Sequence, residues 1–108
     1  MEALDVAKKI NLKIIELDKL KESLEGLAIE KANAAANYEK KLAMVTLRLS
    51  QGDSAISLID KLSRGECADE KMAMDLAESR YKNQLKIIDL TEAQLNGYQS
   101  INRFLAEA

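Results

Sequence analysis

The sequence of 108 residues contains no histidine, no proline and no tryptophan, and only one cysteine. Without histidine the chain lacks the most common general base and the most common metal ligand. A Cys–His nucleophilic pair and the Glu-x-x-His pairs of bundle metal sites are therefore excluded, as is zinc, which needs several Cys or His ligands. No GxSxG, Walker-type or GxGxxG motif occurs. We expect no enzyme activity and no cofactor or metal.

The single cysteine, Cys67, excludes an intrachain disulfide, and a reducing cytoplasm is the simplest compartment. We interpret it as a small, partly buried residue rather than as a reactive thiol. The N-terminal stretch MEALDVAKKINLK lacks the uninterrupted apolar core and the cleavage site of a signal peptide. No segment approaches the ~18 consecutive apolar residues that a membrane span needs. The sequence predicts a soluble cytoplasmic protein without membrane contact.

What the chain does contain is aliphatic and charged residues: 47% are hydrophobic and 31% are charged, whereas four are aromatic and four are glycine. This composition is typical of a helical bundle or coiled coil. Sixteen basic residues are interleaved with eighteen acidic ones, giving a net charge of −2. Clustered Lys and Arg are what a phosphate backbone requires, so a dedicated nucleic-acid binder is not favoured.

Apolar residues recur along the first half with alternating steps of three and four. A mean period of 3.5 residues is the signature of a helix that winds around another helix. A flanking stripe widens this face, which indicates more than one neighbour; it comprises Val6, Leu20, Leu27 and Ala34. We call the main row the expected seam; it reads Ala7, Ile10, Ile14, Leu17, Lys21, Leu24, Ala28, Lys31, Ala35, Tyr38, Leu42, Val45 and Leu49.

The last forty residues carry a second row of the same kind, in which Glu92 takes an apolar position. The capping-box spacing from Thr91 and the Asn96-Gly97 pair allow a kink or restart between residues 89 and 97, although one helix with a local irregularity is favoured. The row reads Met74, Ala77, Tyr81, Leu85, Ile88, Leu95, Tyr98, Ile101 and Leu105.

A short helix is expected between the two long ones, with Ala55, Leu58, Ile59 and Leu62 on one apolar face. Gly52 suits the left-handed position after the first helix, Asp53 or Ser54 can cap the next helix, and Gly65 is expected to end it. The prediction is one all-α domain over residues 1–108, with helices at about 3–49, 54–64 and 68–105. Since the connection is short, the long helices should form an antiparallel, coiled-coil-like hairpin.

An exposed apolar stripe on a thin hairpin favours self-association, with a dimer forming a helical bundle as the first expectation. Lys21 and Lys31 interrupt the expected seam, either to set its register or to lay their stems along it with the ammonium in water. The predicted self-association residues are Ile10, Ile14, Leu17, Leu24, Leu42, Val45, Tyr81, Leu85 and Ile88.

The tail from residue 95 to residue 105 offers Tyr98, Arg103 and Phe104 as candidate contacts for a protein partner, because Tyr, Arg and Phe dominate contact sites. Closure of the bundle by Tyr98, Ile101 and Leu105 is ranked before partner contact. Stacking of the aromatic rings on single-stranded bases is ranked last.

Two stretches of the C-terminal part, residues 77–82 (AESRYK) and 95–105 (LNGYQSINRFL), resemble small uncharacterised helical proteins of Gram-positive bacteriophages and prophages. Such proteins tend to be encoded among early genes for DNA replication and recombination. The resemblance implies a phage-encoded protein of the host cytoplasm that acts through partners, and it carries no catalytic motif.

Three functions are therefore weighed. The first is a non-enzymatic interaction protein, acting as an inhibitor or adaptor on a host or phage protein that the sequence leaves unknown. The second is an accessory single-stranded nucleic-acid factor, and the third is a structural coiled-coil spacer. The second would present one basic surface made of Lys40, Lys41, Arg48, Lys82, Arg103 and Tyr98.

Overall fold

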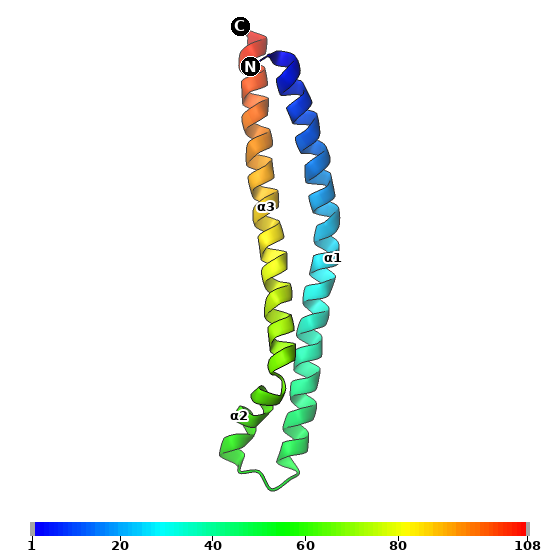
Figure 1. The fold of residues 1–108 in the computed structure, drawn as a ribbon, viewed down its shortest axis with the longest axis vertical. Coiled ribbons are helices and arrows are strands. Elements are labelled where there is room, and N and C mark those ends of the chain that lie inside the picture. The colour runs from blue at the N-terminus through cyan, green and yellow to red at the C-terminus, as the bar shows by residue number, and fades with distance from the viewer. Residues whose placement is uncertain (1, 108) are drawn as a thin grey trace. The chain divides into compact units, whose positions relative to one another are not determined.

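The computed structural model describes residues 2–107, and all of its regular structure is helical (Figure 1). Helix α1 covers Ala3–Ser50, α2 covers Ile56–Glu66 and α3 covers Ala68–Glu107. The all-α class and the order long, short, long are thus confirmed. No described helix combines the length and the apolar character that crossing a lipid bilayer requires.

Two compact units divide the chain. Unit 1 comprises Met1–Gly26 and Lys82–Ala108, and unit 2 comprises Leu27–Tyr81. Within each unit a segment of α1 runs antiparallel to a segment of α3, and unit 2 also contains the connecting helix α2 (Figure 1). The expectation of a single domain over residues 1–108 stays a prediction.

The ends of the helices differ from the predicted caps. No described glycine has a positive φ, so Gly52 does not end α1 in the left-handed conformation; its N–H instead donates to Leu49 O at 3.2 Å. Helix α2 begins after Ala55 without any side-chain cap, so capping by Asp53 or Ser54 is wrong as well. Gly65 lies inside α2, and the helix ends at Glu66, where the N–H of Cys67 still reaches Ser63 O at 3.1 Å.

The buried face of α1 keeps the 3.5-residue period but is rotated from the expected seam. In unit 1, Ala7, Ile14 and Lys21 are exposed, whereas the stripe expected to flank the seam is buried or half-buried. Both stripes are apolar, so the pattern alone does not decide between them. The observed core row of α1 is Val6, Ile10, Lys13, Leu17, Leu20, Leu24, Leu27, Lys31, Ala34, Tyr38, Lys41 and Val45.

Helix α3 shows the same shift. Gln84 and Thr91 face inward where Leu85 and Glu92 were expected, and Leu85 is 37% exposed. Thr91, not Glu92, takes the buried position, and α3 is one uninterrupted helix through residues 89–97, without a restart. With Cys67 just before the helix, its core row keeps the 3-4 alternation: Cys67, Glu70, Met74, Ala77, Tyr81, Gln84, Ile88, Thr91, Leu95 and Tyr98.

Candidate interaction surfaces

Each tyrosine lies in a core row and is covered by a lysine from the opposite long helix. In unit 1, the Lys9 ammonium lies 5.6 Å from the centre of the Tyr98 ring. In unit 2, the Lys31 ammonium lies 4.9 Å from the centre of the Tyr81 ring. Lys71 covers Tyr38 in the same way at 5.6 Å. These cation–π contacts join α1 to α3.

The two lysines that interrupt the expected seam therefore both have partners on α3. Lys31 covers Tyr81, and Lys21 pairs with Glu92 at 3.4 Å in unit 1. Glu92 is the residue that interrupts the expected row of α3, so the two interruptions meet each other. Since both side chains of the Lys21–Glu92 pair are about half exposed, the pair contributes little to stability.

A polar cluster holds the junction of α2 and α3 against α1 in unit 2. Lys41 Nζ donates to Glu70 Oε1 at 2.7 Å and to Glu66 O at 3.2 Å, and Arg48 pairs with Glu66. The hydrogen bond from Lys41 lowers the pKa of the Glu70 carboxyl below its ordinary value. The same hydrogen bond raises the pKa of Lys41, outweighing the opposing effect of desolvation. The ion pair thus stabilises both charged forms.

Three of the basic residues on which a nucleic-acid function would depend have partners within the chain. Lys41 and Arg48 are engaged with carboxylates of α2 and α3, and Arg103 Nη2 donates to Ser100 Oγ at 3.3 Å. Glu30 pairs likewise with Arg80 of α3 at 2.6 Å. Some ion pairs, such as Lys21–Glu92 and Arg80–Glu30, join two helices, whereas others, such as Lys13–Glu16 and Lys71–Asp75, lie within one helix.

The predicted self-association residues are spread over both units. Leu17, Val45 and Ile88 are buried inside the chain. Ile14 and Leu85 are exposed. The remaining members are half-buried: Ile10, Leu24, Leu42 and Tyr81.

The three candidate partner residues of the tail do not share one environment. Tyr98 is half-buried beneath Lys9, whereas Arg103 and Phe104 are exposed. Phe104 is the most exposed of the aromatic residues, at 70%. Tyr98 lies in the core row of α3 and Leu105 is half-buried, whereas Ile101 is exposed.

Helix α2 exposes most of its expected apolar face. Only Ile59 is half-buried, while Leu58 and Leu62 are exposed and lie four residues apart on one side. The buried residue that fixes α2 is polar: Ser63 accepts a hydrogen bond from Thr46 Oγ1 at 3.1 Å. Because a hydroxyl pair anchors the helix, its leucines are left on the surface.

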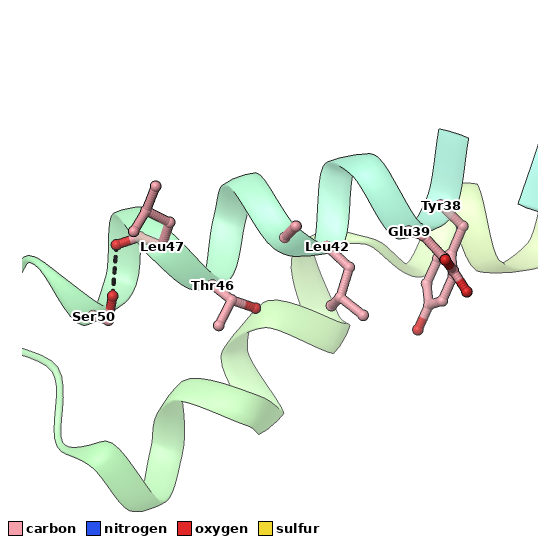
Figure 2. A pocket seen from close by; sticks show the side chains of 7 residues that line it. Tyr38, Glu39, Leu42, Thr46, Leu47 and Ser50 are labelled. Atoms are coloured by element: carbon pink, nitrogen blue, oxygen red, sulfur yellow. Dashed lines mark hydrogen bonds between the residues drawn. The ribbon is translucent and has the colours of Figure 1, made fainter. Parts of the chain in front are cut away.

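A groove of about 590 Å³ lies along the C-terminal part of α1 in unit 2. Figure 2 shows Tyr38, Leu42 and Thr46 projecting from the same side of α1, and the Ser50 hydroxyl donating to Leu47 O at 2.8 Å. All of its lining residues belong to α1: Tyr38, Glu39, Leu42, Ala43, Thr46, Leu47 and Ser50. A groove with walls from a single helix is open on its other sides, unlike the concave pockets that bury most of a small molecule.

Cys67, the lone thiol, is fully buried at the junction of α2 and α3. Among residues 2–107, no three Cys, Asp or Glu side chains are arranged to hold a metal ion.

Comparison of the chain with known protein families, with curated proteins and with solved structures gave no match.

Proposed function

We propose that this protein is a non-enzymatic helical interaction protein that binds another protein through exposed apolar surfaces, and that it also self-associates as a dimer. The observation that carries the proposal is the apolar face of α2, where Leu58 and Leu62 lie side by side on the surface. Contiguous exposed apolar side chains mark protein-binding sites. The engaged state of Lys41 and Arg48 supports a protein partner over a nucleic acid.

The setting comes from the resemblance of the C-terminal stretches to phage proteins. We propose that the chain acts in a Gram-positive bacterial cell, as an inhibitor or adaptor on a host or phage protein. A lysate of such cells is therefore the appropriate source in which to search for its partner.

The test is capture of the partner from this lysate by the tagged chain, with and without nuclease, followed by mass spectrometry. We expect one protein in stoichiometric amount that survives nuclease. A double variant, Leu58→Asp with Leu62→Asp, should weaken capture by at least about tenfold, since each change removes apolar contact area.

The matched control carries Ile15→Asp and Ile29→Asp, which place the same charges at two exposed isoleucines of α1. Circular dichroism checks that both double variants keep their helices. Capture that is lost on nuclease treatment would favour the nucleic-acid factor. Capture that is reduced equally by both double variants would remove α2 as the binding surface.

A further inference from the structure

Helix α3 carries a second apolar row in unit 1 that does not face α1. Its large members are Ile87, Leu90, Ile101 and Phe104, which are 45%, 60%, 39% and 70% exposed. With Gln94 and Gly97 between them, the positions follow one another in steps of three, four, three, four and three. This is the period that pairs α3 with α1 in the core, so the row is suited to another helix.

We infer that the occupant of this outer row is the same row of a second copy of this chain, running antiparallel to it. The inference rests on the self-association in the proposed function and assigns it a surface. The sequence of steps reads the same from either end, so the row can pair with an antiparallel copy of itself in a self-complementary interface about a two-fold axis.

An axis midway between Leu95 and Asn96 matches the side chains by size. Ile87 faces Phe104 of the partner subunit, and Leu90 faces Ile101 of the partner subunit. Each of these apolar pairs occurs twice. At the centre Gln94 faces Gly97 of the partner subunit, so the longer polar side chain meets the residue that has none. Nothing in the chain itself lies within 4 Å of a Cβ built on Gly97, so its own fold gives no steric reason for the glycine.

Charge determines the direction of the pairing. Four residues of α3 border the outer edge of the row: Lys86 at one end, Glu107 at the other, and the uncharged Ala93 and Ser100 between them. The antiparallel arrangement brings Lys86 beside Glu107 of the partner subunit, twice per dimer. A parallel two-fold arrangement would place the edges that carry Lys86 and Glu107 on opposite sides of the interface, so this pair of opposite charges would not form.

The first measurement is the dimer dissociation constant from sedimentation equilibrium. Leu90→Asp changes the interface twice per dimer and should weaken the wild-type dimer on the order of 100-fold. Ile15→Asp is the matched control, because Ile15 is also exposed and lies on the side of α1 away from its core row; it should dimerise as the wild type does. A wild-type chain that stays monomeric, or a Leu90→Asp dimer of unchanged strength, overturns the inference.

The second measurement fixes the direction and remains informative if Leu90→Asp loses helicity. Separately tagged Lys86→Cys and Glu107→Cys chains are mixed and treated with a short-armed bismaleimide, with the wild-type chain as a blank for its buried Cys67. We expect a crosslink between the two different variants. Crosslinks only between identical variants, or none, overturn the inference. If the wild type is a dimer but the mixed crosslink is absent, the proposed self-association stands and only the outer-row interface is overturned. If the wild type is a monomer, both the self-association and the interface are overturned.

Discussion

At the scale of single residues, polar side chains in the core rows form hydrogen bonds either with the other long helix or within their own helix. Gln84 Nε2 donates to Leu20 O at 3.1 Å and to Ser23 Oγ at 2.7 Å in unit 1. Thr91, 3% exposed, satisfies its hydroxyl within α3 by donating to Ile87 O at 2.8 Å. Since buried polar groups without partners are costly, these bonds make a mixed core tolerable. The bonds of Gln84, which cross to α1, also restrict how far the two helices can slide.

The ion pair between Lys41 and Glu70 predicts a pH dependence of stability. The pKa of Glu70 is lowered in the folded chain, so its contribution is present above the ordinary carboxyl pKa of about 4.3 and is lost as the pH falls through the folded value. The raised pKa of Lys41 affects stability at the alkaline end of the pH range. Its contribution is complete below the ordinary lysine pKa and is lost as the pH rises through the folded value.

We therefore expect the urea midpoint of the wild type to decrease when the pH is lowered from neutral to below the ordinary carboxyl pKa. The midpoint of Glu70→Gln should decrease less. Both are measured by circular dichroism. Glu22→Gln, which removes an exposed carboxylate from α1, is the control and should follow the wild type. If the urea midpoint of Glu70→Gln changed with pH as much as that of the wild type, the Lys41–Glu70 pair would not couple protonation to folding.

At the scale of the elements, the sequence predicted which residues are helical better than which face is buried. The ends of α1 and α3 are close to the expected ones because the 3.5-residue period and the absence of proline act locally. The buried face depends on the partner helix. Leu85 looked like a core residue and Gln84 did not, yet the glutamine faces inward because Leu20 and Ser23 of α1 supply its acceptors.

For the candidate surfaces too, exposure depends on tertiary contacts that local spacing does not reveal. The residue types of Arg103 and Phe104 near the end of α3 predict contact residues; both side chains are exposed, and the contact itself stays a prediction. The exposed leucines of α2 could not be predicted, since a pattern of four apolar residues normally predicts a buried face. Here Ser63 takes the buried position through its hydrogen bond with Thr46, which is a tertiary contact that no local spacing reveals. The apolar side chains of α2 that its sequence predicts to be buried, Leu58 and Leu62, are therefore exposed.

Gly26 allows a prediction about α1 as an element. It lies in the interior of the helix, has no positive φ, and has nothing within 4 Å of a built Cβ. Alanine should therefore be accommodated without strain and should stabilise the chain by about 1 kcal/mol, because glycine is less favourable in a helix and freer in the unfolded chain. The measurement is the free energy of unfolding from urea titration.

Gly52→Ala is the matched control for Gly26→Ala. Gly52 lies in the turn after α1, where an added Cβ makes only ordinary contacts with Leu49 O and Arg48 O at 3.7 and 3.9 Å, so the helical part of the gain should be missing. A destabilising Gly26→Ala would indicate that another body packs against α1 at that position.

At the scale of the whole molecule, the internal core is small, so association with a second copy should contribute to the stability of the fold. Among the described residues only six apolar side chains are buried, whereas seventeen large apolar ones are exposed. Helices gain most of their stability from packing an apolar face. A chain with so few buried side chains should therefore draw part of its stability from contacts with a second copy, and folding should be linked to concentration.

This linkage gives the last prediction. A subunit contact that exists only in the folded state stabilises that state by mass action, so the melting midpoint of the wild type should rise as the protein concentration is raised over about a hundredfold range. Leu90→Asp should melt at a midpoint that does not change with concentration, close to that of the dilute wild type, because Leu90 is exposed within one chain. Calorimetry at several concentrations measures both. A wild-type midpoint independent of concentration would mean that the exposed rows of this chain serve other partners, and that each chain folds on its own small core.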